Sequence, residues 1–489
     1  MKKGLLLCAG LILFAGSVFS SPWPQFRRDV WRSGFSPDSA PSARLLRWRF
    51  QTGGQIWSSP AVSGDTLYIG SDDSTVYALR ATTSNPNGEM FWSRRLSGRV
   101  RASPALAYGF VYVTCFDEYL YCLRQSDGVQ AWRYRLGPAI IAFTSSPVVT
   151  DSCVYVGSES GYCYVLKAVT GSPTGELVWK YYMGKWMHGS PAVRYGRVFI
   201  GQSGDSTGGY YLYCLDQYPP DTLGRVLWRY YIGNLRYGIG NTPAVVDSLV
   251  FFSRDDPYGL RNGVLYCLRA FPTPAETLYW SYPGLGGMMS SAAVAYGRVY
   301  VGMETNGLIE RSFLVFRERP ANPPNTELIW RYYPIGTIRS SPAVASGKVF
   351  VGCEDNRLYC FNALSNVPET LWTYATGGGV WSSPAVSNGM VFVGSWDRYV
   401  YGFGTPGSGV EVFPSQESRV TSNTVFPNPF TSFATVPGHT SDRFALYDVS
   451  GRRVGVYRGD RIGEGLVPGV YFIQSMERKD GLAKIVKIR

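Results

Sequence analysis

A five-residue motif, Ser-Ser-Pro-Ala-Val or a close variant, recurs eight times and constrains the fold more than any other feature of the chain. The copies are about 42 to 52 residues apart, and each is followed by apolar segments, polar turns and a tryptophan-containing segment. Four short strands form a sheet that cannot bury both faces alone, so the units must pack against one another in a ring. We therefore predict an all-β chain with an eight-bladed β-propeller. The motif's proline position is occupied by Pro60, Pro104, Pro147, Pro191, Pro243, Ala292, Pro342 and Pro384.

The two ends of the repeat array predict how the ring closes. The last unit runs through residues 399–403 and then lacks a tryptophan strand, whereas residues 45–50 form such a strand, around Trp48, with no unit before it. We expect this N-terminal strand to complete the eighth blade, because closure removes an unpaired sheet edge.

Composition agrees with an all-β chain and lowers the expectation of catalysis. Only 17% of residues are charged while 15% are aromatic, and there are 56 glycines, which favours short twisted strands and tight turns. The two histidines, His188 and His439, exclude a multi-histidine metal centre and leave little material for a histidine triad or general base. The net charge of +12 is spread along the chain, so nucleic acid is not an expected partner.

Aspartate recurs at the inner turn of several units, at Asp73, Asp117, Asp355 and Asp397. Its carboxylate can accept hydrogen bonds from nearby backbone N–H groups, which is the role we expect. A calcium site is the alternative, but each turn carboxylate lacks a second and third carboxylate at ligand spacing.

Residues 1–21 have the layout of a secretory signal peptide, with Lys2 and Lys3 before an apolar run and small residues at its end. We expect an exported chain with no transmembrane segment after cleavage, either soluble or attached at a surface by other means. In an oxidising compartment disulfides can form. We expect the cysteines after the signal peptide to be buried free thiols. Disulfide bridges between Cys115 and Cys122 and between Cys353 and Cys360 are the alternative. Four cysteines occupy the position of Ala78 in the first unit: Cys122, Cys214, Cys267 and Cys360.

Four tryptophans stand four residues after a glycine, as in Gly128 and Trp132, and a leader reads Trp-Pro-Gln-Phe-Arg-Arg-Asp from Trp23 to Asp29. With the Ser-Pro-Ala-Val strands, these features resemble the PQQ-like repeat propellers over residues 23–403. That family includes quinoprotein dehydrogenases and non-catalytic members. Quinoprotein alcohol dehydrogenases carry two adjacent cysteines, and this chain has none, so we expect the non-catalytic type without PQQ or calcium. A secreted PQQ-dependent dehydrogenase or a polysaccharide-active propeller is the alternative.

The chain after the repeats changes character. Residues 404–423 are rich in glycine, serine and proline, as in a linker, and residues 424–489 show alternating apolar strands that predict a small immunoglobulin-like β-sandwich. The Asn-Pro-Phe start at Asn428, the Tyr-Asp-Val-Ser-Gly-Arg centre and the Gly-Val-Tyr segment resemble the C-terminal sorting domain of the type IX secretion system. The resemblance implies passage through the periplasm and delivery to the outer cell surface or the medium.

Candidate site residues follow from the repeat. The connection to each innermost strand crosses one end of the ring, so the residue three before each motif proline should approach the mouth of the central channel. Tryptophan and arginine there suit stacking on a sugar or aromatic group together with an anion, and plugging of the channel is the alternative. These residues are Trp57, Arg101, Thr144, His188, Gly240, Met289, Arg339 and Trp381.

Together these features predict a signal peptide at 1–21, a propeller at 22–403, a linker at 404–423 and a sorting domain at 424–489. We expect a secreted or cell-surface binding or scaffolding module with a protein or glycan partner. The sorting domain would engage the type IX secretion machinery.

Overall fold

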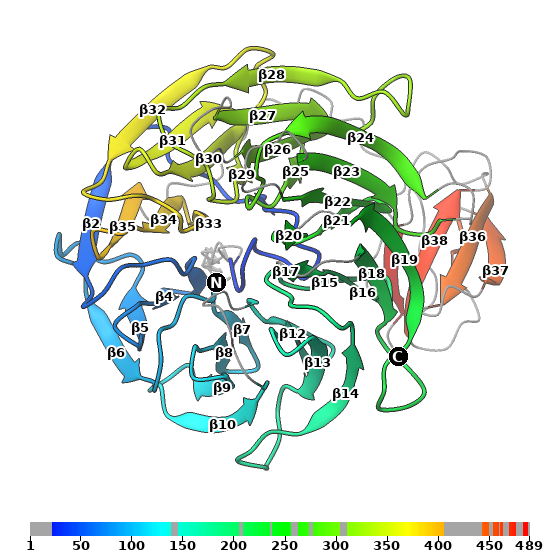
Figure 1. Ribbon diagram of the computed structural model, residues 1–489, viewed down its shortest axis with the longest axis horizontal. Helices are drawn as coiled ribbons and strands as arrows, with labels where there is room; N and C mark the ends of the chain where they lie inside the picture. The colour runs from blue at the N-terminus through cyan, green and yellow to red at the C-terminus, as the bar shows by residue number, and fades with distance from the viewer. Residues whose placement is uncertain are drawn as a thin grey trace, which may run out of the picture.

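The computed structural model describes residues 22–137, 145–204, 209–234, 237–255, 263–272, 277–303, 311–404, 443–448, 453–458, 460–462, 469–475 and 483–487. Within these residues every regular element is a β-strand. Eight sheets, each built on four antiparallel strands, are arranged around a central axis like the blades of a propeller (Figure 1). The predicted all-β fold with an eight-bladed β-propeller is confirmed.

Each blade begins with a three-residue innermost strand that carries the Ala-Val part of the motif and ends with the tryptophan strand on the outside. Blade 1 comprises β3 (Ala61–Ser63), β4 (Thr66–Gly70), β5 (Thr75–Arg80) and β6 (Met90–Arg95), and blade 2 comprises β7 (Ala105–Ala107), β8 (Phe110–Thr114), β9 (Tyr119–Arg124) and β10 (Gln130–Arg135). Blade 3 comprises β11 (Val148–Thr150), β12 (Cys153–Gly157), β13 (Tyr162–Lys167) and β14 (Leu177–Tyr182), and blade 4 comprises β15 (Ala192–Arg194), β16 (Arg197–Gly201), β18 (Tyr210–Asp216) and β19 (Val226–Gly233).

The second half of the ring repeats this plan. Blade 5 comprises β21 (Ala244–Val246), β22 (Leu249–Arg254), β23 (Gly263–Arg269) and β24 (Leu278–Leu285), and blade 6 comprises β25 (Ala293–Ala295), β26 (Arg298–Met303), β27 (Ser312–Arg317) and β28 (Leu328–Tyr332). Blade 7 comprises β29 (Ala343–Ala345), β30 (Lys348–Cys353), β31 (Arg357–Asn362) and β32 (Thr370–Ala375), with β1 (Phe35–Ser36) added in parallel to β29. A separate two-stranded ladder joins β17 (Ser203–Gly204) to β20 (Tyr237–Gly238).

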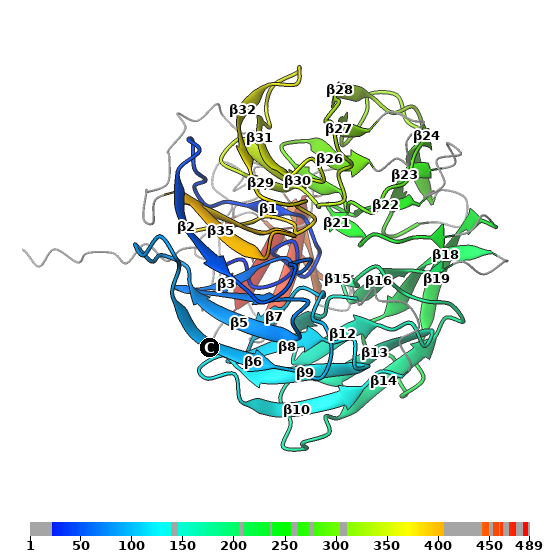
Figure 2. The same cartoon turned by 60° about the vertical axis from the view of Figure 1, so that its left-hand side comes forward.

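The N-terminal strand closes the ring, as the sequence predicts. Blade 8 consists of β33 (Ala385–Ser387), β34 (Met390–Gly394), β35 (Tyr399–Gly404) and, as its outer strand, β2 (Leu46–Gln51). β2 pairs antiparallel with β35, and Trp48 is only 1% exposed (Figure 2). The first and last strands of the propeller therefore share one sheet, which leaves no open seam.

The tryptophans join neighbouring blades. The indole N–H of Trp132, for example, donates to the carbonyl oxygen of Ala168 in blade 3 at 3.1 Å. A glycine lies against several of these rings: Gly128 has a φ of +70°, and a Cβ atom there would lie 2.6 Å from Cε3 of Trp92. Equivalent indole bonds to the next blade are made by Trp48, Trp92, Trp179, Trp228, Trp280 and Trp330.

The cysteines lie in the walls between blades. Cys122 pairs across its sheet with Tyr112 on one side and Trp132 on the other, so only a small side chain fits there. All eight cysteines of the described residues are free thiols, and neither Cys115/Cys122 nor Cys353/Cys360 forms a bridge. Burial raises the pKa of the Cys122 thiol to about 12.

The inner-turn aspartates accept hydrogen bonds, as expected. Asp397 accepts from the backbone N–H groups of Gly377 at 2.6 Å and Tyr399 at 3.0 Å, and from the hydroxyl of Tyr401 at 2.6 Å. Asp73 makes the same set of contacts in blade 1. The carboxylate thus fixes the turn and ties it to the preceding blade connection.

The described C-terminal strands form one antiparallel sheet in the order β37-β36-β38-β39. They are β36 (Arg443–Asp448), β37 (Arg453–Arg458), β38 (Gly469–Ser475) and β39 (Ala483–Lys487). The predicted signal peptide, most of the linker and the Asn-Pro-Phe start lie outside the described residues. None of the described residues belongs to a helix with the length and apolar character needed to cross a membrane.

Candidate functional site

In blades 1, 6 and 7 the first serine of the motif links its blade to the next. The hydroxyl of Ser58 accepts the N–H of Gly70 at 3.1 Å and donates to the carbonyl oxygen of Ala102 in blade 2 at 3.0 Å. Ser290 and Ser340 make the same pair of bonds in blades 6 and 7. The glycine that often ends the second strand is therefore held by a serine 12 residues earlier.

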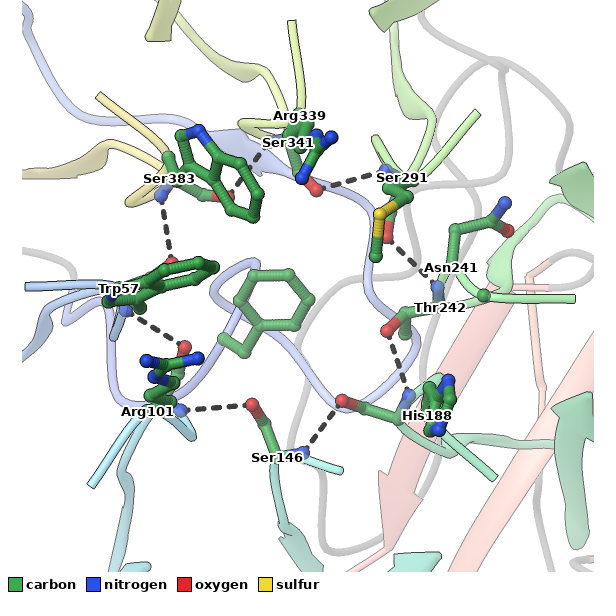
Figure 3. Close-up of a pocket in the computed structure, with 17 residues that line it drawn as sticks. Trp57, Arg101, Ser146, His188, Asn241, Thr242, Ser291, Arg339, Ser341 and Ser383 are labelled. Atoms are coloured by element: carbon green, nitrogen blue, oxygen red, sulfur yellow. Dashed lines mark hydrogen bonds between the residues drawn. The ribbon is translucent and has the colours of Figure 1, made fainter. Parts of the chain in front are cut away.

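The second serine forms a closed ring around the channel. In every blade the backbone N–H of this residue donates to the side-chain hydroxyl of its counterpart in the next blade, at 2.8 to 3.0 Å (Figure 3). The bond from Ser383 in blade 8 to Ser59 in blade 1 completes the circle. The ring consists of Ser59, Ser103, Ser146, Ser190, Thr242, Ser291, Ser341 and Ser383.

A cavity of about 160 Å³ lies at this ring and defines the mouth of the channel. All eight hydroxyl residues line it, together with Phe26 from the N-terminal part of the chain. The structure brings seven of the eight predicted positions to this cavity, and Thr144 lies outside the described residues. The seven are Trp57, Arg101, His188, Gly240, Met289, Arg339 and Trp381.

Three tryptophans cluster on one side of the mouth. The ring centroids of Trp57 and Trp381 are 4.3 Å apart, and Trp396 lies 5.1 Å from the first and 4.7 Å from the second. Sequence reasoning missed Trp396, which precedes the turn aspartate Asp397. The sequence signal that could have identified Trp396 is its place directly before the turn aspartate, because the residue in that place also approaches the mouth in other blades.

Each mouth arginine stacks on a tryptophan and is paired with a carboxylate. The Cζ atom of Arg101 lies 3.9 Å from the ring centroid of Trp57, and its Nε and Nη2 donate to the two oxygens of Asp72 at 2.8 and 2.7 Å. The Cζ atom of Arg339 lies 3.8 Å from the ring centroid of Trp381, and its Nε lies 3.4 Å from Oε1 of Glu354. Carboxylate pairing offsets much of the positive charge, so the arginines contribute stacking surface as well as hydrogen-bond donors.

His188 lies on the opposite side of the mouth. Its Nε2 atom is 3.5 Å from Oε1 of Glu159, whose side chain is only 4% exposed, and its ring is 5.9 Å from that of Trp186. The residue before the inner turn again supplies the acidic partner, as Asp72 and Glu354 do for the arginines. Gly240 and Met289, the mouth positions of blades 5 and 6, carry no charge themselves. The buried carboxylate of Asp255 lies beside Gly240, where a Cβ atom would be 3.5 Å from its Oδ2.

The N-terminal segment, residues 22–44, lies along the axis-facing edges of the innermost strands. Trp23 exchanges two backbone hydrogen bonds with Val62 in blade 1, and carbonyl oxygens of Val30 and Trp31 accept from blades 4 and 5. Further oxygens of the segment accept from the equivalent N–H groups of blades 2, 3, 6 and 7, and Asp38 accepts from Asn388 in blade 8. The segment thus contacts all eight blades in order and satisfies edge N–H groups that would otherwise face the channel.

Two buried arginines of this segment bind backbone carbonyl oxygens of the ring. Arg27 donates to Ser291 at 2.6 Å and also to Ala292, while Arg32 donates to Pro147 and Pro191, each at 3.0 Å. Burial lowers the pKa of both guanidinium groups to about 9, which leaves them charged at neutral pH. The segment therefore closes the channel below the mouth, and the mouth is a one-ended cavity.

The donor set of the mouth does not fit PQQ held with calcium. Among the described residues that line the cavity there is no aspartate, glutamate or cysteine, and the oxygen donors are hydroxyls and one amide, whereas calcium is bound mainly by carboxylate and carbonyl oxygens. The carboxylates next to the lining, Asp72, Glu159 and Glu354, are paired with Arg101, His188 and Arg339. No group of three or more His, Cys, Asp and Glu side chains suited to a metal ion occurs anywhere in the described residues. The cavity is also smaller than the ~300–1,000 Å³ usual for drug-sized ligands, so it suits a small group or a protruding side chain.

Solved structures with the same fold include an alcohol dehydrogenase, BamB and a designed protein. The quinohemoprotein alcohol dehydrogenase from Comamonas testosteroni is 16% identical, with a TM-score of 0.63 over 78% of this chain and 80% of that one. BamB from Moraxella catarrhalis is also 16% identical, with a TM-score of 0.55 over 74% of this chain and 98% of that one. The computationally designed Ika8 protein is 12% identical, with a TM-score of 0.57 over 74% of this chain and 100% of that one. At these identities the similarity shows the fold alone.

Sequence comparison identifies the family. No curated protein sequence matches the chain. The family model described as outer membrane protein assembly factor BamB matches residues 27–173, 117–212 and 320–452, which together exceed half of the chain. The predicted PQQ-like repeats are thereby confirmed, and the chain belongs to the PQQ-like repeat family of the outer membrane protein assembly factor BamB.

Proposed function

We propose that this chain is a non-catalytic binding or scaffolding propeller whose channel mouth receives a side chain or a small group of a partner. The observation that carries the proposal is the cluster of Trp57, Trp381 and Trp396 with two stacked arginines at a one-ended cavity. Aromatic and arginine side chains that neighbouring groups hold in place are typical anchors of binding interfaces. The family match supports this reading, because the matched model describes an assembly factor.

The test is the double variant Trp57→Ala/Trp381→Ala, compared with the unchanged chain in pull-downs from intact cells and on a glycan array. We expect the variant to remain folded by circular dichroism and to lose the captured partner. The matched control is Tyr333→Ala, which removes an aromatic side chain that is 56% exposed elsewhere on the ring. Retention of the partner by the folded double variant would move the binding site away from the mouth.

The alternative is a secreted PQQ-dependent dehydrogenase. We test it because the chain is similar in fold to a quinohemoprotein alcohol dehydrogenase. It predicts that PQQ with Ca²⁺ binds the purified chain, gives a bound-quinone absorbance and supports reduction of a dye with an alcohol. The binding proposal predicts none of these. Dye reduction that depends on added PQQ would replace the proposal.

For delivery, we propose that residues 1–21 direct the chain to the periplasm and that residues 424–489 engage the type IX secretion machinery. The mature protein would then reach the outer cell surface or the medium. The proposal rests on the sequence motifs of both ends. Removal of residues 424–489 should trap the chain in the periplasm of its native host, as measured by cell fractionation, and unchanged appearance at the surface would refute the sorting role.

A further inference from the structure

A second cavity, of about 230 Å³, lies off the axis beside His188. It is formed by the turn between β12 and β13, the connection from β14 to β15, and the start of β17. It shares no lining residue with the mouth, although His188 contacts residues of both. Its lining consists of Glu159, Ser160, Gly161, Tyr182, Gly184, Lys185, Trp186 and Ser203.

Two buried polar side chains hold the wall of this cavity in place. Ser203, only 1% exposed, donates its N–H to the carbonyl oxygen of Trp186 at 2.8 Å, and its hydroxyl accepts the N–H of His188 at 2.9 Å. Gln202, 3% exposed, donates its side-chain amide to the carbonyl oxygen of Met183. The connection that carries Lys185 and Trp186 is therefore fixed at both ends, which preorganises the cavity for a ligand.

The cavity offers groups of opposite charge and an aromatic surface. Glu159 supplies a buried carboxylate, and Lys185 supplies an ammonium group whose Nζ lies 3.8 Å from the ring centroid of Tyr210. Tyr182 is 59% exposed and lies across the turn at Gly161, where a Cβ atom would be 2.8 Å from its Cε2 atom. A glycine at this position, with a φ of +86°, is thus what allows the tyrosine ring to cover the turn.

We propose that this second cavity binds a single neutral sugar residue. A sugar hydroxyl both donates and accepts hydrogen bonds, so one ring can donate to the Glu159 carboxylate and accept from the Lys185 ammonium group. Its C–H face can pack against Tyr182 or Trp186, and the opposite charges of the two polar groups balance each other, which favours a neutral ligand. The inference goes beyond the proposed function, because it names a glycan as ligand at a site separate from the mouth.

The experiment uses the full chain and three probes, methyl β-glucoside, methyl α-mannoside and N-acetylglucosamine, in saturation-transfer difference NMR. We expect saturation transfer to at least one probe, with an affinity in the range of about 1 mM. Trp186→Ala and Glu159→Gln should each weaken binding by roughly tenfold, since each removes a principal contact. Tyr182→Ala, at an exposed position that will not disturb folding, should weaken it by roughly threefold to tenfold.

Two matched variants separate this site from the mouth. Trp57→Ala/Trp381→Ala and Tyr333→Ala should leave sugar binding unchanged within about twofold, because neither touches the second cavity. The inference is overturned if no probe binds at about 20 mM, or if the folded Trp186→Ala and Tyr182→Ala variants keep full affinity. It is also overturned if glycine displaces the sugar, because that result would indicate a site for zwitterions. If only the mouth variant loses sugar binding, the inference is overturned and the proposed function is supported. If the mouth variant keeps its cellular partner, that result counts against the proposed function alone.

Discussion

The mouth and the closed part of the channel are built by the same eight motifs, yet they present opposite chemistry. At the mouth the motif shows side-chain hydroxyls, and the N–H groups of the same residues are used within the ring. In the closed part the motif shows carbonyl oxygens and strand-edge N–H groups, which the N-terminal segment covers. At the mouth, the repeats thus satisfy the backbone N–H groups of the ring by bonding to one another. In the closed part, the backbone polar groups of the repeats need a non-repeating segment as their hydrogen-bond partner.

The difference indicates where sequence change is tolerated. Arg27 and Arg32 are enclosed by backbone carbonyl oxygens, so their roles are structural. The residue three before each motif proline stands outside the hydroxyl ring and can vary without breaking it. Variation from tryptophan to arginine, histidine, glycine and methionine among the blades is what a ligand-specific surface on a fixed frame requires.

The largest effect is expected from removing residues 22–44 while keeping β2. This leaves edge N–H groups of seven innermost strands without their acceptors and opens the channel. We expect loss of cooperative unfolding, or a fall in Tm of more than about 10 °C, in thermal unfolding followed by circular dichroism. Removal of residues 424–489 is the control and should leave the propeller transition in place; equal effects of the two deletions would contradict the comparison.

A single arginine should matter more in the closed part than at the mouth. Arg32→Ala removes hydrogen bonds from a charged group to several buried carbonyl oxygens, with an expected loss of about 3 kcal/mol in the free energy of unfolding. Arg101→Ala should lose about 1 kcal/mol, because Arg99 lies 3.9 Å from the same carboxylate of Asp72 and can take over part of the pairing. Denaturant unfolding of both variants measures the difference, and a larger loss for Arg101→Ala would reverse the assignment of roles.

The hydroxyl ring can be tested at the bond between blades 7 and 8. Ser383→Ala removes the acceptor of the N–H of Ser341, so a buried donor is left unsatisfied at a cost of about 1–2 kcal/mol. Ser383→Thr keeps the hydroxyl and should be nearly neutral, since Thr242 occupies the same position in blade 5. Equal stability of the two variants in denaturant unfolding would show that the ring bond is dispensable.

The smallest effect concerns the walls between the two ends. Burial raises the pKa of Cys122, Cys163 and Cys214 to about 12, above the ordinary thiol value of 9.0. A folded-state pKa raised in this way contributes stability that is complete below pH 9 and is lost as the pH rises toward 12. We expect a falling Tm over that interval and negligible reaction of native thiols with a thiol reagent at pH 8, with reaction appearing on unfolding; rapid native reaction would show that the walls are open.

The sequence by itself determined the number of blades, the closing strand around Trp48 and, through a constant offset from the motif proline, the residues that line the mouth. Strand periodicity, turn residues and repeat spacing are local properties, so they can be read along the chain. Only the tertiary structure decided which groups of different repeats bond to one another. The hydroxyls of the ring meet N–H groups of motifs about 42 to 52 residues away, except that Ser59 meets the N–H of Ser383, 324 residues away. The pairing of Arg101 with Asp72 depends on the angle between two blades. The role of Arg27 and Arg32 likewise appears only when carbonyl oxygens of blades 3, 4 and 6 converge on the axis, because no local pattern specifies where a non-repeating segment finds its acceptors.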